Sequence, residues 1–371
     1  MRRLVFFALA CCSSAFAARR YEFAVGPGGD RVVSFQARGM AGTWRQGTAP
    51  VVTVRSGRNA SQLVLIHSPQ WFSYSIFLPE TNGTVQMESD ADFEIQDFKQ
   101  QSEPDEVLRH APILVSRNEP GILQNDVPLV VYCQVSRVPR RLDYTCIFSN
   151  EDGGTDTQAL FARWGRSADI ELVYSIEWDS AGTPRETIQS YDHKIVPFIG
   201  KKEGDHPIIH VATKNNVFDS SGAGAYHFQL PPRAYDSFER TRESVMDEQP
   251  WTYSIMREEL EREQKNFDPR RYLYVDFRGA VQEAAIGAGV KFKSGEEVSS
   301  YGEKPKNRVN RSGWTRIGIP LPPGKTVSDV ESLFFDCDKA GQCRIEAIAQ
   351  TMLLDETDRP VKIPMAYSFR F

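Results

Sequence analysis

Hydrophobic and polar residues alternate along most of the chain, and Gly and Pro residues separate the runs. In the first part, apolar and β-branched residues gather in 51–54, 63–66 and 72–77, with turn residues such as Asn82 and Gly83 after them. Short runs of this kind are typical of strands in a half-buried sheet. They predict an N-terminal β unit over 18–99. Because one sheet cannot bury both of its faces, we expect this unit to pack face to face against another sheet.

A second β unit is predicted over 108–232, after a polar linker near 100–107. Apolar residues occupy the even positions from Ile170 to Trp178, which places Asp169 and Glu171 on the other face at the start of a strand. Residues 179–182 have turn chemistry, so 183–191 is expected to return antiparallel. The open end of this predicted hairpin therefore carries acidic side chains.

The spacing of apolar residues changes from the strand period to the helix period between 234 and 267, where a helical connector is predicted. Trp251, Ile255 and Met256 give an apolar stripe within 246–266, and charges of both signs follow at helical spacings. From 268 to 371 the β pattern returns with Gly and Pro turns, which indicates a C-terminal sandwich. The whole pattern predicts an all-β protein of two or three antiparallel β-sandwich (jelly-roll-like) units with one connecting helix.

Residues 1–17 have the features of a secretory signal peptide. Arg2 and Arg3 precede a short apolar run, and Ala15-Phe16-Ala17 forms a small-x-small cleavage site. An alternative interpretation makes Cys11 the acylated residue of a lipoprotein. No other run approaches the roughly 20 apolar residues that a membrane helix needs. We therefore expect a secreted or periplasmic protein without a transmembrane segment.

Four cysteines follow the predicted signal peptide, in two pairs that are local in sequence. Cys133 and Cys146 lie in two β-rich runs joined by 139–141, and Cys337 and Cys343 bracket a turn-type segment. The CxxC clusters typical of metal sites are absent from the sequence. We expect the disulfides Cys133–Cys146 and Cys337–Cys343, as suits an oxidising compartment.

Charge argues against one class of partner. The formal net charge is -5 at pH 7, and the basic residues form no stripe interleaved with aromatics. Nucleic-acid-binding proteins need such basic surfaces to neutralise phosphates. A nucleic-acid partner is therefore not expected.

The candidate catalytic residues are Asp169, Glu171 and His193, at the open end of the predicted hairpin. If the turn closes symmetrically, Asp169 faces Asp192 and Glu171 faces Ser190. If the register moves by one residue, His193 itself faces Asp169 and Asp192 turns away. The sequence does not choose between these registers. In both, carboxylates and an imidazole meet, which suits acid–base catalysis or a divalent metal.

The same carboxylates have structural partners close by in sequence. Arg163 and Arg166 precede Asp169, and Arg–carboxylate bridges to Asp169 or Glu171 would use these residues without any catalysis. This bridge network is the interpretation that the sequence favours.

Two further histidines, His206 and His210, flank a segment of strong β propensity. On a strand they would point to one face about 13 Å apart, at roughly 3.3 Å per residue, which is too far to share one metal. At most one of them can therefore join the carboxylates and His193. His206 is the better candidate because it begins the strand beside a flexible Gly-Asp pair.

Residues 108–218 contain a fixed order of short motifs. His110-Ala111-Pro112 comes first, then Asp169-Ile170-Glu171, then His193, and then His206-Pro207 with an apolar run. This order resembles the vacuolar protein sorting-associated protein 62 family, which has an Ala-Pro-apolar start, an Asp-Trp-Glu strand, a His on the returning strand and a His-Pro-apolar strand. Ile170 stands in place of the Trp, and 213–216 stand where that family has a Ser-His pair. The resemblance implies one coherent β unit over this third of the chain.

Exposed aromatics would let a secreted sandwich bind sugars, and Trp314 is the candidate binding residue of the C-terminal unit, with Tyr301 as a second. The other candidate binding residues are Arg163, Arg166 and His206. The leading hypothesis is a secreted binding or surface-associated protein whose candidate partner is an extracellular glycan. The alternative is an extracellular polymer hydrolase that uses the carboxylates and His193, with or without a metal. The sequence identifies no cofactor.

Overall fold

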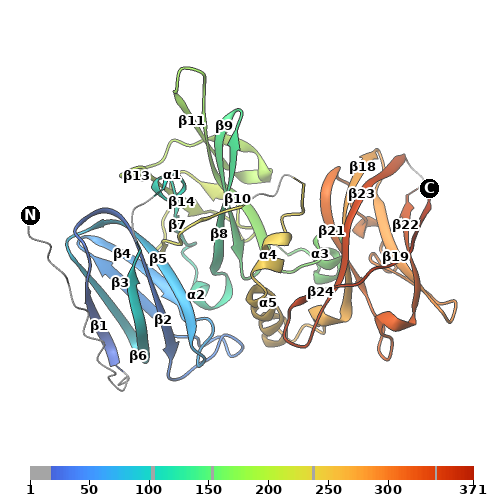
Figure 1. Cartoon of the computed structure of the whole chain (residues 1–371), viewed down its shortest axis with the longest axis horizontal. Coiled ribbons are helices and arrows are strands. Elements are labelled where there is room, and N and C mark those ends of the chain that lie inside the picture. The colour runs from blue at the N-terminus through green and yellow to red at the C-terminus, as the bar shows by residue number, and fades with distance from the viewer. Residues whose placement is uncertain (1–17, 102–104, 152–153, 236–238, 339–340) are drawn as a thin grey trace, which may run out of the picture.

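The computed structural model describes residues 18–371 except 102–104, 152–153, 236–238 and 339–340. The predicted signal peptide lies outside the described residues. In Figure 1, N-terminal strands (blue), central strands (green to yellow) and C-terminal strands (orange to red) follow one another along the long axis. Most strand pairs are antiparallel, as the all-β fold class predicts, and the parallel pairs among the described residues are β7 with β14, β8 with β17 and β22 with β25. Within the described part of the chain, no helix is both long and apolar enough to cross a membrane.

The N-terminal strands form one sheet in the order β4-β3-β6-β2-β5, with β1 also paired to β6. β6 is long, and its first part pairs with β1 and β3 while its last part pairs with β2. Side chains from these strands, such as Phe35, Val54 and Phe93, share one core. The strands that we expected to form two packed sheets are therefore joined through β6 into one sheet, which curves around this core. The strands are β1 (Ala18–Ala24), β2 (Gly28–Gly39), β3 (Val51–Ser56), β4 (Asn59–Val64), β5 (Phe72–Thr81) and β6 (Thr84–Gln100).

Two sheets make up the central part. The larger has the order β12-β11-β10-β9-β8-β17, and the smaller has the order β13-β14-β7-β16 with β15 on β14. The larger consists of β8 (Pro128–Arg137), β9 (Arg140–Phe148), β10 (Asp169–Trp178), β11 (Pro184–Gln189), β12 (Ile195–Pro197) and β17 (Arg233–Ala234). The smaller consists of β7 (Ile113–Val115), β13 (Lys202–Glu203), β14 (His206–Val211), β15 (Phe218–Asp219) and β16 (His227–Phe228).

The strand that carries Asp169 contains an irregularity that the alternating pattern did not predict. Opposite β9, Leu172 faces Thr145 but Tyr174 faces Tyr144, so Val173 is an extra residue. From Tyr174 onward the strand has changed faces, and Tyr174 lies on the same face as Asp169 rather than on the opposite one.

The hairpin register also differs from both alternatives that the sequence left open. β10 pairs with β11 only from Tyr174, opposite Ile188, to Trp178. Asp169 lies beyond this paired part and faces Phe148 of β9 instead. Neither Asp192 nor His193 is therefore a cross-strand partner of Asp169.

The predicted connecting helix is divided into two. α4 ends at Glu248 and α5 begins at Trp251, with Pro250 at the N-cap of α5, where a residue without a backbone N–H is tolerated. The apolar stripe of α5, including Ile255 and Met256, is buried. The helices of the described residues are α1 (Glu106–Arg109), α2 (Ile122–Asn125), α3 (Thr157–Trp164), α4 (Ser244–Glu248) and α5 (Trp251–Arg262).

The C-terminal strands form a sandwich of two four-stranded sheets, β21-β18-β23-β24 and β20-β19-β22-β25. Phe277 from the first sheet and Phe335 from the second meet in its core. The strands are β18 (Tyr272–Gln282), β19 (Ile286–Phe292), β20 (Glu297–Ser299), β21 (Gly313–Pro320), β22 (Val330–Cys337), β23 (Gln342–Leu354), β24 (Pro360–Lys362) and β25 (Tyr367–Arg370).

The central core continues into both neighbouring parts. It includes Trp44 and Phe77 of the N-terminal part and Tyr272 and Met352 of the sandwich. α3 packs on β21, and Gly165 ends the helix in a left-handed conformation (φ 63°), where a Cβ would lie 2.7 Å from Cγ of Arg316. The domain boundaries expected from the sequence stay predictions.

One of the two predicted disulfides is present. Cys337 at the end of β22 is bonded to Cys343 near the start of β23, with a Cα–Cα distance of 5.9 Å. The prediction for Cys133 and Cys146 is wrong, because both are free and buried. The register of β8 and β9 places Cys133 opposite Tyr144, two positions away from Cys146.

Candidate functional site

Asp169, the first candidate catalytic residue, is enclosed by protein. The residue is 3% exposed, and its carboxylate accepts hydrogen bonds from the amide of Asn216 (3.1 Å) and the backbone N–H of Ile170 (2.9 Å). Nη1 of Arg166 lies 3.8 Å from its Oδ1. Burial, reinforced by the nearby Glu171 carboxylate, raises the pKa of Asp169 well above its usual range. Asp169 therefore belongs to a buried polar network.

The two arginines near Asp169 behave differently. Arg166 bridges Asp169 and Glu243, with 3.1 Å between its Nε and Oε1 of Glu243, and all three side chains are almost fully buried. Arg163 points elsewhere and donates to the backbone carbonyl of Lys306. The favoured Arg–carboxylate bridge is thus present for Arg166, and Arg163 takes no part in it.

Asn216 connects this network to the rest of the central sheets. Its Nδ2 also lies 3.4 Å from Oδ1 of Asp126 and 3.2 Å from the Asn150 carbonyl, and its Oδ1 accepts from Arg117 (3.3 Å). Asn216 is fully buried with φ 43°, a conformation that Asn tolerates better than most residues. The Asn215-Asn216 pair after β14 was the only sequence signal for this role.

Glu171 and His193 form the part of the cluster that reaches solvent. The Glu171 carboxylate accepts a hydrogen bond from the amide of Gln189, and its Oε2 lies 3.7 Å from Nδ1 of His193. Nε2 of His193 is 3.0 Å from Nδ2 of Asn215. The interaction with Glu171 raises the pKa of His193 despite its partial burial. His193 is half exposed, and Asp192 pairs with Lys194 instead.

Replacing Glu171 by Gln is expected to lower the pKa of His193 toward its ordinary value of about 6.5. Because the pKa of His193 in the folded protein is raised, the ion pair stabilises the fold below the unfolded-state pKa and is lost as pH rises through the folded-state pKa. NMR titration of the His193 ring in both proteins measures the difference. Asp192→Asn is the control that leaves the value unchanged, and an unaltered His193 pKa in the Glu171 variant would contradict the pairing.

His206 is separate from this cluster. Its Nδ1 is 2.9 Å from the Ala111 carbonyl, its Nε2 is 2.9 Å from Oδ1 of Asp30, and its ring stacks on Phe77. The expectation that His206 joins Asp169 is therefore wrong, since both ring nitrogens are engaged at the start of β14. Across the described residues, no three or more His, Cys, Asp and Glu side chains are grouped so that they could hold a metal ion.

A cavity of about 790 Å³ lies beside the cluster and is lined by β12, β14 and the segments next to them. Its polar wall is a row across four strands: His227 faces Val115, Val115 faces His210, and His210 faces Asp219. We call it the histidine cavity. Its lining residues are Val115, Ile188, Ser190, Val196, Pro197, Ile199, Gly200, Lys201, Ile208, His210, Asp219, Ser220, Ser221, Gly222 and His227.

Burial favours the neutral form of both imidazoles in this cavity. Burial lowers the pKa of His227, and burial followed by the nearby His227 lowers the pKa of His210. Nδ1 of His210 is shielded from solvent and has no hydrogen-bond partner among the described residues. Gly222 packs on this ring, and a Cβ there would come 3.1 Å from Nδ1. β14 was expected as a strand, but the two-residue strands β15 and β16 that complete the row were not visible in the sequence pattern.

A smaller cavity of about 280 Å³ adjoins the histidine cavity and shares His210 and Asp219 with it. It adds Asn118, Glu119 and the ring of Tyr191, which is 53% exposed. The two cavities together offer carboxylate, amide, imidazole and aromatic groups next to an aliphatic wall.

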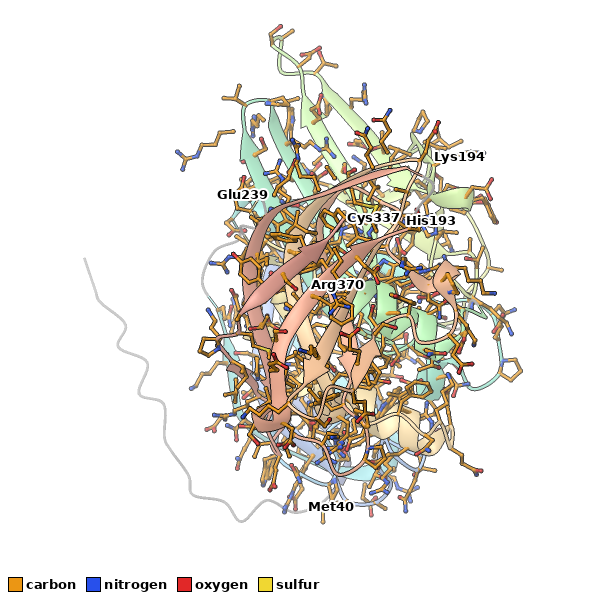
Figure 2. All side chains as sticks on the ribbon, turned by 90° about the vertical axis from the view of Figure 1, so that its right-hand side faces the viewer. Met40, His193, Lys194, Glu239, Cys337 and Arg370 are labelled. Carbon is orange, nitrogen blue, oxygen red and sulfur yellow. A yellow bond between two sulfur atoms is a disulfide. The ribbon has the colours of Figure 1, made fainter. Side chains whose placement is uncertain are left out.

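Neither of the expected aromatic residues of the C-terminal sandwich is a fully exposed ring. Trp314 is partly buried, and the Tyr301 hydroxyl donates to Asp336 (2.6 Å). The exposed aromatic rings of this sandwich lie on and just after β25 at a sheet edge: Tyr367, Phe369 and Phe371. Figure 2 looks onto this sandwich and labels Arg370 of the same strand.

Comparison with known proteins gives no family for this chain. No family model matches it, and no curated protein matches it. One similar solved structure is a sugar-binding protein, the EclA C-terminal domain, at 14% identity over 26% of this chain and 83% of that chain, with a TM-score of 0.19. Another is the N-terminal CBM22-1-CBM22-2 tandem domain from Paenibacillus barcinonensis Xyn10C, at 8% identity over 88% of this chain and 82% of that chain, with a TM-score of 0.16. At these TM-scores neither likeness supports an argument, and the resemblance of 108–218 to the sorting-associated family stays a prediction.

Proposed function

We propose that this chain is an extracellular glycan-binding protein and that a sugar residue occupies the histidine cavity. The observation that carries the proposal is the row of His227, His210 and Asp219 in a cavity whose other walls are largely aliphatic. Its volume of about 790 Å³ lies within the ordinary range for small-ligand sites.

The chemistry of this wall matches that of a sugar ring, which has hydroxyl groups around its rim and C–H groups on its faces. A neutral imidazole donates one hydrogen bond and accepts another, and the Asp219 carboxylate accepts several. Ile199 and Pro197 supply apolar contact for the faces of the ring, and Tyr191 in the adjoining cavity offers an aromatic surface for a second residue. A neutral ligand with many hydroxyl groups therefore fits better than a strongly charged one.

The extracellular setting rests on two supports. The Cys337–Cys343 disulfide suits an oxidising compartment, and the signal peptide predicted over 1–17 would direct the chain there. The alternative hydrolase has less support, because Asp169 is held by Asn216 and Arg166 inside the protein.

Asp219→Asn is expected to weaken glycan binding roughly tenfold or more, because a hydrogen bond to a charged group contributes about 1.5–3 kcal/mol. The amide still resembles the carboxylate that accepts the Ser221 backbone N–H, so the local turn is conserved. A panel of neutral and acidic oligosaccharides on an array, followed by calorimetry, measures the effect.

Two further variants make this test sharper. Gly222→Val should abolish binding, because the valine side chain would displace the His210 ring. Asp192→Asn removes an exposed carboxylate that does not line either cavity and should bind as the wild type does. A glycan that binds the Asp219 and Gly222 variants with wild-type affinity would contradict the proposed site.

A further inference from the structure

Two arginines where α3 meets β21 have no carboxylate partner among the described residues. Arg163 on α3 donates to the Lys306 backbone carbonyl, and its Nε is shielded from solvent without an acceptor. Arg311, just before β21, donates to the Arg163 carbonyl (2.8 Å) and to the Thr315 hydroxyl (2.6 Å). Both cations are therefore held by neutral acceptors.

The buried arginines nearby, by contrast, are paired with carboxylates. Arg166 is paired with Glu243 at 3.1 Å, and Arg316 is paired with Asp247 and Asp276 at 2.7 and 2.6 Å. Arg163 and Arg311 are partly buried. A cation that is shielded from water without a counter-charge costs free energy, so an anion bound between these two arginines would stabilise the junction.

The surroundings of Arg311 carry an excess of positive charge. Burial, together with the nearby Arg166, Arg242 and Arg163, lowers the pKa of Arg311 to about 10. Glu243 is the carboxylate that opposes them, and it is already the partner of Arg166.

Two other residues lie at this junction: an aromatic ring that contacts the cations, and a buried amide that can donate to an oxyanion. The Trp164 ring lies 5.0 Å from the Arg311 guanidinium and 5.8 Å from that of Arg163, so both cations are arranged about one aromatic surface. Asn307, which follows Lys306 in the chain, is 1% exposed, and its Nδ2 has no acceptor among the described residues. A ligand with several acceptor oxygens would satisfy donors of this kind.

We propose that the junction of α3 and β21 is an oxyanion-binding site in which Arg163 and Arg311 bind a carboxylate or sulfate group beside Trp164. A guanidinium group pairs with such anions through two parallel hydrogen bonds, which gives both charge and geometry. The oxyanion restores the charge balance that the described residues lack. On a glycan this group is a uronic acid carboxylate or a sulfate ester, and that extension rests on the proposed function.

Inorganic sulfate tests the site directly on the full chain. At constant ionic strength set with chloride, sulfate is expected to raise the melting temperature of the wild type, because a ligand of the native state stabilises it by mass action. Sulfate also stabilises proteins in general, so the informative quantity is the part of the shift that a variant loses. Arg311→Gln and Arg163→Gln should each lose the site-specific part, and the second variant serves if the first folds poorly.

The matched control is Arg137→Gln, at the exposed tip of the β8–β9 hairpin, which removes the same charge and should keep the full sulfate shift. An equal sulfate shift in the wild type and in all three variants would overturn the site. A shift that Arg137→Gln also loses would show a general charge effect and would overturn it equally.

Three oligosaccharide probes then separate this site from the proposed function. A galacturonate oligomer, a sulfated oligomer and a neutral oligomer are compared on the wild type and on Arg311→Gln. Weaker binding of an acidic oligomer to the variant, with neutral binding unchanged, supports both proposals. Sulfate binding without binding of any oligomer supports the oxyanion site and refutes glycan binding. Neutral binding with no effect of sulfate or of Arg311→Gln supports glycan binding and refutes the oxyanion site.

Discussion

Arg316→Met is expected to lower the free energy of unfolding by about 3–5 kcal/mol, the cost of removing one partner from a buried ion pair. The Arg316 side chain is fully buried. Its guanidinium donates to both carboxylate oxygens of Asp276 (2.6 and 2.7 Å) and to both of Asp247 (2.9 and 2.7 Å). It also donates to the Tyr253 hydroxyl at 2.5 Å. The variant leaves the buried Asp276 and the partly buried Asp247 without their cation, and Met fills much of the volume, so the loss measures charge rather than packing.

The pH dependence of this loss identifies its cause. In the wild type, burial opposes ionisation of Asp247, but the attraction and hydrogen bonds of Arg316 hold the pKa of Asp247 below its usual range. That contribution is present above the unfolded-state pKa and is lost as pH falls through the folded-state value. Burial already raises the pKa of Asp276, and without Arg316 it also raises that of Asp247, so stability is then lost as pH rises. The penalty of the variant should therefore be smaller near pH 4 than at pH 7.

Urea unfolding at the two pH values measures the penalty. Arg370→Met is the matched control, because Arg370 pairs with Glu297 on the surface of the same sandwich, where both side chains are about 40% exposed. An exposed pair contributes at most about 1 kcal/mol. A loss for Arg316→Met that is no larger than the loss for Arg370→Met, or one that does not change with pH, would contradict this role.

Much of the fold follows from local pattern, because a strand with one buried face has a period of two whatever lies beyond it. Alternation predicted the strand that became β10, and a short turn between two strands predicted Cys337–Cys343. The same reasoning failed for Cys133 and Cys146, because their pairing depends on a register that turn length and packing decide together. Val173 shows the limit most clearly, since one extra residue in β10 exchanges the two faces of the strand.

The candidate site was harder to predict because its members come from distant elements. Arg166 and Asp169 are neighbours in sequence, and their bridge was expected, but Glu243 follows 77 residues after Arg166. The row of His227, His210 and Asp219 depends on β15 and β16, which have two residues each, too few for any periodicity. His210 also needs a parallel pairing with β7, which no local signal specifies. Side chains that meet across such short strands can therefore be identified only from the structure.

Arg166→Met is also expected to lower the free energy of unfolding by about 3–5 kcal/mol, because it removes the cation of a buried ion pair in the central part of the protein. Arg166 is enclosed where β10 begins, and it is in contact with Glu243 of the α4 N-cap. Because the pKa of Asp169 is already raised, this group can become protonated when the cation is removed. The uncompensated charge of Glu243 then accounts for most of the lost stability. The side chains of both carboxylates are 5% exposed or less, so water cannot replace the guanidinium.

A double-mutant cycle separates this charge effect from packing. In the Arg166→Met background, Glu243→Gln removes the unpaired charge, so the double variant should be destabilised less than the sum of the two single variants, by roughly 1–3 kcal/mol. Arg163→Met, three residues earlier on α3, has no carboxylate partner among the described residues and should cost about 1 kcal/mol or less. Unfolding of the four proteins in urea gives the coupling energy. Strict additivity of the two single losses would show that Arg166 contributes through its bulk, and the bridge network would then not be what holds α4 against β10.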